Sequence, residues 1–396
     1  MAFQGGFFAF PGGKPEEDED ARVCAAREVL EEIGVRIDPK TLIEVGRWVT
    51  PAFAPRRFDT RFFLATCPEG EEALVNSDEH DFGEWIKPKD AVAKWMEGQI
   101  LAATPVLYAL RCLAEGLDNI VERMTANPWA RGEEIHEIEL RAGIVLVPVR
   151  TPTLPPATHT NCYVVGGDEV VVIDPASPYE EEQAVLDRVL ERRSVREIWL
   201  THLHRDHVGG ANHLRDKLGV KVVAHPITAR DLEGMVKVDR VFEENERLEL
   251  KGKPGWDLRV LHTPGHARGH VCIFEAKNGS LITGDLMAGF GTVVIDPPEG
   301  HMTTYFDSLR RMQALEVTAL FPAHGPVMAN ARAKIQEYLD HRSAREQKIL
   351  EAWRAGRREP SEIVKDVYTD VAPAMYGLAE RSVVAHLEKL REEGRI

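Results

Sequence analysis

The segment THLHRDHVGG, residues 201 to 210, places three histidines and an aspartate within six consecutive positions. The apolar run REIWL before it predicts a strand, so these side chains follow the strand at its carboxyl end. Imidazole and carboxylate groups packed this closely favour a metal cation, because several ligands have to point at one place. One cation needs three or four ligands and two cations need about six, so other segments must supply the rest.

Three later segments offer ligand-type residues in the same context, directly after a predicted strand. They are HTPGHARGH with His266, LITGDL with Asp285 and FPAHGP with His324. Open α/β sheets gather their chemistry at the carboxyl ends of strands, so we expect all these residues to meet at one edge. Imidazoles combined with two carboxylates favour zinc, with iron or manganese as alternatives. The neighbouring residues predicted to be structural hydrogen-bonding groups are His225, His262 and His270.

The succession of HxHxDH, TPGH, GD and AHG resembles the metallo-β-lactamase superfamily. The resemblance implies an α/β fold over residues 141–330, an αββα sandwich with two metals in a cleft at one edge. A hydroxide between two cations is nucleophilic at neutral pH, and it would be the attacking group, with Asp206 as a catalytic residue beside it. The implied ligands are His202, His204 and His266 for one metal, Asp206, His207 and His324 for the other, and Asp285 as the bridge between them.

A second motif lies near the amino terminus, in GKPEEDEDARVCAAREVLEEIGV. Glu28, Glu31 and Glu32 stand at positions i, i+3 and i+4, so three carboxylates share one face of a predicted helix. The spacing from Gly13 through this segment resembles the Nudix box. That resemblance implies an α/β/α domain over residues 1–122 that hydrolyses nucleoside diphosphates linked to another moiety. It also implies that the three glutamates hold Mg²⁺ or Mn²⁺ and that Glu28 is catalytic.

Two further features refine this interpretation. Glu79 resembles the additional catalytic glutamate found late in Nudix domains, and Glu84 is the alternative. The segment WVTPAFAPRRFDTRFFLATCPEG is similar to the coenzyme-A-cleaving branch of the family. Nudix domains usually place a strand or two before the box, whereas only QGGFFAF precedes it here. We therefore expect an amino-terminally shortened sheet or a true start further upstream.

Residues 123–140 are polar, with Pro, Gly and several acids, and are predicted to be a linker. Residues 331–396 are predicted to be helical, and HRSAREQKIL followed by LEKLREEGRI resembles the winged-helix tail of the lactamase-beta-like endoribonucleases. The alternative for this tail is a lid or a dimerisation element, which would make the protein a homodimer. The densest basic run of the chain lies there and comprises Arg342, Arg345, Lys348, Arg354, Arg357 and Arg358.

Composition sets outer limits on the function. The net charge of −15 argues against a protein coated in nucleic-acid-binding charge, although it allows a local basic groove. The five cysteines are scattered without a CxxC pair, which is typical of reduced thiols in the cytoplasm. The first residues do not read as a secretory signal, and no apolar run approaches the roughly 20 residues that span a bilayer. A cytoplasmic protein without a membrane partner is expected.

Three functions remain open at this point. The first is a dinuclear-zinc phosphodiesterase that cuts single-stranded RNA, fused to a Mg-dependent Nudix pyrophosphohydrolase. The second is a thioesterase in the central block, because TPGHxxGH also resembles glyoxalase II and a coenzyme-A-binding domain would suit an acyl-CoA substrate. The third is a regulatory protein whose winged helix binds nucleic acid. The complete ligand set favours an enzyme over the third.

Overall fold

The computed structural model describes residues 6–51, 57–75, 80, 82–127, 135–252 and 255–396. The chain divides into two compact units, Met1–Ala142 and Gly143–Ile396. None of the described helices combines the length and the apolar character needed to cross a membrane.

The first unit holds a two-stranded antiparallel sheet and several helices. Helix α1 (Ala21–Ile33) begins after Asp20, whose side chain accepts a hydrogen bond from the Arg22 N–H, and it ends at Gly34 in the left-handed conformation. The elements after α1 are η1 (Pro39–Thr41), β1 (Ile43–Val49), β2 (Asp59–Leu64), α2 (Pro88–Met96), α3 (Thr104–Ala114), α4 (Ile120–Thr125) and β3 (Ile138–Arg141). Helix α1 confirms the prediction that three glutamates share one helix.

The segment predicted to be a linker contains regular structure at both ends. Helix α4 and strand β3 occupy parts of residues 123–140, and residues 128–134 lie outside the described part of the chain. Met124 is buried in an apolar cluster with Val45 and Ala109, and the Leu140 carbonyl accepts a hydrogen bond from Trp95 Nε1 at 3.1 Å. Apolar packing and a hydrogen bond from a side chain to the backbone therefore hold the two ends of this segment within the first unit. The predicted domain boundaries themselves stay predictions.

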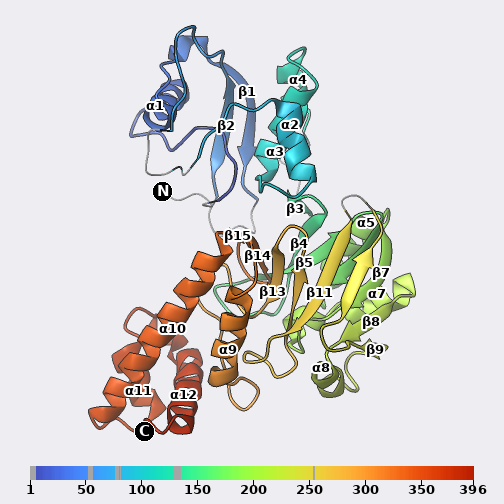
Figure 1. The fold of residues 1–396 in the computed structure, drawn as a ribbon, viewed down its shortest axis with the longest axis vertical. Helices are drawn as coiled ribbons and strands as arrows, with labels where there is room; N and C mark the ends of the chain where they lie inside the picture. Colours follow the sequence, from blue (N-terminus) through green and yellow to red (C-terminus); the bar gives the residue numbers. More distant parts are fainter. Residues whose placement is uncertain (1–5, 52–56, 76–79, 81, 128–134, 253–254) are drawn as a thin grey trace. The chain divides into compact units, whose positions relative to one another are not determined.

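The second unit is built on two sheets with helices on their outer faces (Figure 1). One sheet contains, in spatial order, β4 (Ile144–Arg150), β5 (His159–Gly166), β6 (Glu169–Ile173), β7 (Ser194–Trp199), β8 (Lys221–Ala224) and β9 (Arg240–Val241). The other contains β10 (Arg247–Leu250), β11 (Trp256–His262), β12 (Val271–Glu275), β13 (Ser280–Gly284), β14 (Ala319–Pro322) and β15 (Met328–Ala329). Most central strands are apolar throughout, as expected for strands covered on both faces.

Two apolar cores attach the helices to these sheets. The first core joins β4–β8 to α5 (Glu180–Leu190) and α7 (Ala211–Leu218), through residues such as Leu186 and Leu214. The second joins β11–β14 to α9 (Met302–Gln313) and to the first half of α10 (Ala331–Arg354). Two short helices, α6 (Arg205–Val208) and α8 (Pro226–Asp231), follow β7 and β8. The resulting order of layers is the αββα sandwich that the sequence predicts.

Residues 331–396 form α10, α11 (Pro360–Val367), η3 (Pro373–Met375) and α12 (Tyr376–Glu392). The second half of α10 packs with α11 and α12 around an apolar cluster that includes Ile349, Ile363 and Leu387. The first half belongs to the sandwich, because Ile335 and Tyr338 are buried in the core with α9. Helix α10 therefore joins the sandwich and the tail as one continuous element.

A buried carboxylate links α10 to α12. The Glu346 oxygens lie 2.9 Å from Lys389 Nζ, 3.2 Å from His386 Nδ1 and 2.8 Å from an Arg395 nitrogen. Burial alone would raise the pKa of Glu346. The hydrogen bonds from His386 and Lys389 outweigh it and lower the pKa from 4.5 to about 2. The ionised carboxylate is therefore part of the folded tail.

Replacing Glu346 by Gln should lower the free energy of unfolding at pH 7 by about 1–3 kcal/mol, because the buried Lys389 ammonium loses its counter-charge. A carboxyl with a depressed pKa stabilises the fold above its unfolded pKa and loses that effect as the pH falls towards the folded value. The difference between variant and wild type should therefore shrink between about pH 5 and about pH 3. Denaturant titrations across this range measure it, with the exposed Glu351→Gln as control. A difference independent of pH would contradict the assignment.

Candidate metal centre

The predicted ligands of the central domain converge at one edge of the sandwich. His202 and His204 follow β7, His266 follows β11, and Asp285 and His324 follow β13 and β14. Asp206 and His207 lie in the short helix α6 directly after His204. Residues separated by more than 100 positions meet here because each of these strands ends at this edge, as the sequence predicts.

The ligand atoms form two groups. One contains His202, His204, His266 and Asp285, and the other contains Asp206, His207 and His324, with the ligand atoms of each group within 4.8 Å of one another. In the first group His204 Nδ1 lies 2.9 Å from His202 Nε2 and 3.0 Å from His266 Nε2. In the second, His324 Nε2 lies 3.4 Å from Asp206 Oδ2. Each group has the residue types that bind a transition-metal ion.

The Asp285 carboxylate lies between the two groups. Its Oδ2 is 3.5 Å from His266 Nε2, whereas its Oδ1 is 3.5 Å from His207 Nε2 and 3.5 Å from His324 Nε2. One oxygen thus faces each group, the arrangement of a carboxylate that bridges two cations. Asp285 Oδ1 and His207 Nε2 are buried polar atoms without a hydrogen-bond partner. Unpaired buried polar atoms are costly, so these residues fit a pair of cations.

Burial and neighbouring charges together set the pKa values of these residues. Burial and the adjacent imidazoles hold the pKa of His202 well below its usual value. Burial and His266 lower the pKa of His204 to about 3. Both rings are therefore neutral at physiological pH and have a nitrogen lone pair for a cation. For Asp285, burial would raise the pKa, but His324 and His207 outweigh it and keep the carboxyl ionised.

A second layer of hydrogen bonds fixes the ring orientations. His266 Nδ1 lies 2.8 Å from the Val294 carbonyl, and His324 Nδ1 lies 3.1 Å from the His159 carbonyl. Each bond uses Nδ1 and leaves Nε2 directed at the centre. His270, predicted to be structural, accepts a hydrogen bond from the Asp285 N–H at 3.0 Å. The structural prediction for His270 is therefore confirmed.

The other two histidines with a structural prediction have partners close to them in the fold. His262 Nε2 lies 2.9 Å from the Arg268 carbonyl, and its ring stacks on His225 with centroids 4.1 Å apart. The His225 side chain also accepts a hydrogen bond from the Ile227 N–H, capping α8. Both rings therefore have local hydrogen-bonding roles.

Asp174 is a site residue that the sequence analysis did not identify. Its carboxylate accepts hydrogen bonds from the Thr201 N–H at 2.8 Å and the Thr201 hydroxyl at 2.6 Å, and it lies 2.8 Å from His207 Nδ1. It follows β6 in VVVIDP, so its position after a predicted strand was the one signal in the sequence, and its φ in the structure is 51°. Asp174 therefore orients both the start of the HxHxDH segment and His207.

The two glycines after this motif pack closely against the loop after β6. Gly209 and Gly210 have ordinary helical φ values of −56° and −94°. A Cβ at Gly209 would approach the Ala176 carbonyl oxygen to 2.6 Å, and one at Gly210 would approach the Pro175 oxygen to 2.2 Å. Close packing against the loop after β6 therefore requires glycine at both positions.

The predicted Nudix ligands lie together in the first unit. The Glu28 carboxylate packs on Gly13, where a Cβ would approach Glu28 Oε1 to 2.2 Å. Glu32 is 5% exposed and accepts a hydrogen bond from the Gly12 N–H at 3.1 Å. Glu31 is held by Arg27, 3.0 Å from its Oε2, and Arg27 also contacts Glu28 Oε1 at 2.9 Å. The glutamates of α1 thus contact the loop at Gly12 and Gly13.

The fourth predicted Nudix residue is not described. Glu79 lies outside the described residues, and its alternative Glu84 pairs with Lys94 Nζ at 2.5 Å. His80, to which the sequence analysis gave no role, lies 3.1 Å from Glu32 Oε1. Among the described residues, only the groups of the central domain bring three ligand atoms within 4.8 Å. Metal binding by the glutamates therefore stays a prediction.

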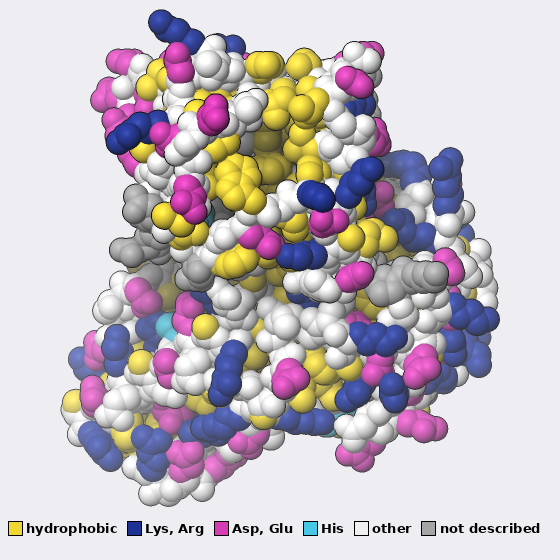
Figure 2. Space-filling model, turned by 45° about the horizontal axis from the view of Figure 1, so that its top comes forward, with side chains coloured by type: hydrophobic (Ala, Val, Ile, Leu, Met, Phe, Trp, Pro, Cys, Tyr) yellow, Lys and Arg dark blue, Asp and Glu magenta, His cyan; other side chains and the backbone are white. Residues whose placement is uncertain are grey.

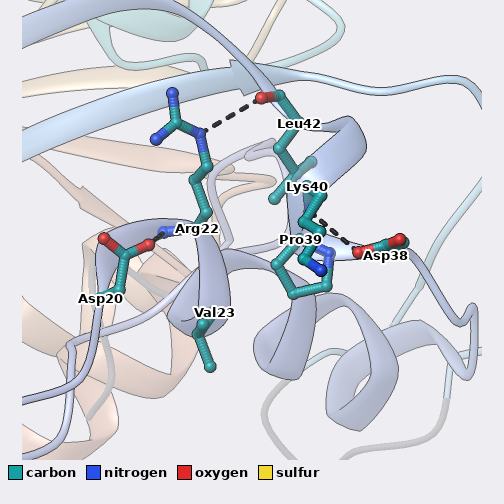
Figure 3. A pocket seen from close by; sticks show the side chains of 7 residues that line it. All are labelled: Asp20, Arg22, Val23, Asp38, Pro39, Lys40 and Leu42. Carbon is teal, nitrogen blue, oxygen red and sulfur yellow. Dashed lines mark hydrogen bonds between the residues drawn. The ribbon is translucent and has the colours of Figure 1, made fainter.

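A surface pocket of this unit lies at the start of α1 (Figure 3). Arg22, whose Nε donates to the Leu42 carbonyl at 3.3 Å, and Asp38, which accepts from the Lys40 N–H, line it. None of the three predicted glutamate ligands contributes to its lining. The pocket is therefore separate from the candidate Nudix site.

The chain belongs to the metallo-beta-lactamase superfamily, whose family model matches residues 155–324. Models of the NUDIX domain and of the beta-lactamase associated winged helix domain match residues 2–104 and 360–396. The chain is a hydrolase of this superfamily with a Nudix domain before it and a winged-helix domain after it. These matches confirm the three families that the sequence motifs indicate.

Curated relatives match a little over half of the chain. A "Beta-lactamase-like protein 2 homolog" of Drosophila melanogaster is 30% identical over 60% of this chain and 84% of its own length. An "Atrochrysone carboxyl ACP thioesterase" of Paecilomyces divaricatus is 30% identical over 55% of this chain and 67% of its own length. A metallo-beta-lactamase family protein from Thermus thermophilus has a similar solved structure, with TM-score 0.53, 25% identity, and coverage of 64% of this chain and 94% of that one.

Replacing Asp174 by Asn should weaken metal binding by the group around His207 by about 10–100-fold, because the ring loses its charged hydrogen-bond partner. Metal titration with a competing chelator measures this affinity. The matched control is Asp187→Asn, which removes a carboxylate that pairs with His213 on the helical surface. Equal affinities in wild type and Asp174→Asn would show that Asp174 does not orient His207.

Proposed function

We propose that the central site holds two transition-metal ions, with zinc the best match, and hydrolyses an acyl thioester of coenzyme A or an acyl carrier. The observation that carries this proposal is the Asp285 carboxylate, which offers one oxygen to each ligand group. Two bound cations would supply a water molecule of lowered pKa and polarise the carbonyl that it attacks. The residues that would hold them are the seven predicted ligands.

The reaction adds water across the acyl–sulfur bond. The water oxygen joins the acyl carbon, the carbon–sulfur bond breaks, and the products are a carboxylic acid and a thiol. A thiol has a pKa of about 8.5, so it leaves as a thiolate without a strong proton donor. The reaction therefore needs no residue beyond the predicted ligands to protonate the leaving group.

Three observations favour a thioester over RNA. Relatives that are 30% identical are named acyl-carrier-protein thioesterases. The amino-terminal block resembles coenzyme-A-cleaving Nudix domains, so both domains would act on the same carrier. The chain carries a net charge of −15, and on the face in Figure 2 basic side chains are interspersed with acidic ones. RNA binding depends on several Lys and Arg contacts to phosphates.

The tail arginines weaken the alternative of a single-stranded RNA phosphodiesterase. Arg342 and Arg345 are only 2% and 6% exposed. Arg357 pairs with Asp366 at 2.9 Å, and Arg358 lies over the Trp353 ring at 4.5 Å. Lys348 and Arg354 are exposed. The winged-helix match still makes RNA a substrate to test. The RNA hypothesis was based on the resemblance of this tail to that of lactamase-beta-like endoribonucleases.

The purified protein should contain two transition-metal ions per chain and hydrolyse an acyl-CoA or acyl-pantetheine thioester. Asp285→Asn should lower kcat/KM by at least about a hundredfold, which corresponds to about 2.7 kcal/mol, since it removes the bridging charge. Asp307→Asn, on the exposed face of α9, is the control. Elemental analysis and thiol release measure the two quantities. Cleavage of single-stranded RNA without thioester hydrolysis would overturn the proposal in favour of the endoribonuclease.

The amino-terminal site should act independently as a Mg²⁺-dependent pyrophosphohydrolase on coenzyme A or ADP-ribose. Replacing Glu31 and Glu32 together by Gln should abolish this activity, because Mg²⁺ depends on charged oxygen ligands. The thioesterase rate should remain unchanged, and Asp285→Asn should show the reverse pattern. Phosphate-containing products separated by chromatography measure the reaction. Loss of both activities in the double glutamate variant would contradict independence.

A further inference from the structure

We propose that the C-terminal helices position the ligand His266, acting through the peptide unit between Val294 and Ile295. The inference rests on the proposed metal site and assigns to the tail a positioning role there. The segment concerned is the loop between β13 and α9, which begins at Asp285 and passes beside His266.

The two ends of this peptide unit contact the site and the tail. Its carbonyl, Val294 O, lies 2.8 Å from His266 Nδ1. Its N–H, that of Ile295, donates to the Ser382 hydroxyl of α12 at 3.5 Å. A peptide unit is planar and rigid, so an orientation imposed at its N–H is imposed on its carbonyl as well. Ser382 is 5% exposed, and the contact is therefore shielded from water.

Helix α10 fixes the preceding peptide. Arg342 donates a hydrogen bond to the Val293 carbonyl, and its guanidinium lies over the Tyr305 ring at 5.3 Å. Burying an arginine is costly unless its charge and donors are used, and Arg342 is 2% exposed. One turn earlier, the Tyr338 hydroxyl accepts a hydrogen bond from the Ala288 N–H at 2.9 Å. Both residues therefore attach the loop to α10.

The other side of His266 is connected to the tail as well. The Gly265 carbonyl accepts a hydrogen bond from the His301 N–H at 2.7 Å. The Glu392 carboxylate of α12 lies 2.8 Å from His301 Nε2 and accepts from the Thr303 hydroxyl at 2.6 Å. A Cβ at Gly265 would approach Tyr305 Cα to 2.3 Å, so the backbone before His266 packs directly on α9. His266 is thus held from both sides by segments that contact the tail.

These contacts favour a specific role over general support. The Val294 carbonyl fixes which His266 nitrogen carries the proton, and so keeps Nε2 available to the cation. Loss of such a partner typically lowers metal affinity by about 10–100-fold. The second ligand group, around His207 and His324, has its own partners in Asp174 and the His159 carbonyl. Disturbing the tail contacts should therefore affect one of the two cations.

Two buried arginines on α10 allow a matched test. Arg342→Met removes the bond to Val293, whereas Arg345→Met removes an arginine of similar burial that contacts Val367 and Asp370 within the tail. Zinc affinities from chelator competition and the visible spectrum of the cobalt-substituted protein report on each site. His266→Ala identifies which affinity belongs to the His266 group. Arg342→Lys tests partial rescue, because lysine can still donate to the carbonyl.

We expect Arg342→Met to weaken one zinc site at least tenfold and to leave the other unchanged. Arg345→Met should lower the melting temperature of the metal-free protein but leave both affinities intact. Equal effects of the two variants on both sites would overturn the inference and leave a purely structural tail. If Arg342→Met fails to fold, Ser382→Ala against the exposed Ser343→Ala gives the same comparison. Two normal zinc sites without thioesterase activity would contradict the proposed substrate alone, and a wild type without metal would contradict both proposals.

Discussion

The structure of the central domain depends on a carboxylate and an imidazole that are buried without partners. Asp285 Oδ1 and His207 Nε2 face each other across 3.5 Å, and neither has a hydrogen bond. A polar atom in this position costs roughly 1–3 kcal/mol if it stays unpaired. The strand ends, the short helix α6 and the loop after β13 all bring polar atoms to this point. Bound cations would turn an unfavourable arrangement into a favourable one, so folding and metal binding would be coupled here.

The polar residues that surround this site are also buried. Asp174, Thr201 and His270 are almost fully inaccessible, and each contacts a predicted ligand or its backbone. A buried network is stable only if every member is satisfied, and these residues satisfy one another on the side away from the centre. The ligands are consequently presented in fixed orientations. This rigidity is what allows a site to discriminate between metals and to hold a water molecule for attack.

Sequence patterns predicted the parts of the site that are encoded by short, continuous segments. The strand-ending segments with His202, His266 and Asp285 could be recognised because apolar runs and turn residues mark strand ends. Asp174 was missed because an aspartate before a proline after one strand has no local feature that distinguishes it from a turn. The requirement for Gly209 and Gly210 has a related origin. Their requirement comes from a loop that is distant in sequence, which only the folded chain brings close.

The tail shows that a dense basic run need not form one charged surface. Of the six basic residues singled out in the sequence, Arg342 and Arg345 point into the protein and donate to carbonyls and a carboxylate. Helical periodicity alone could not separate the buried from the exposed arginines, because α10 packs against the sandwich in its first half and the tail in its second. A helix whose two halves pack against different partners has no single polar face along its length. Its basic residues are therefore divided between surface charge and internal support, and among the internal ones Arg342 contacts the loop that passes beside His266 whereas Arg345 contacts the tail.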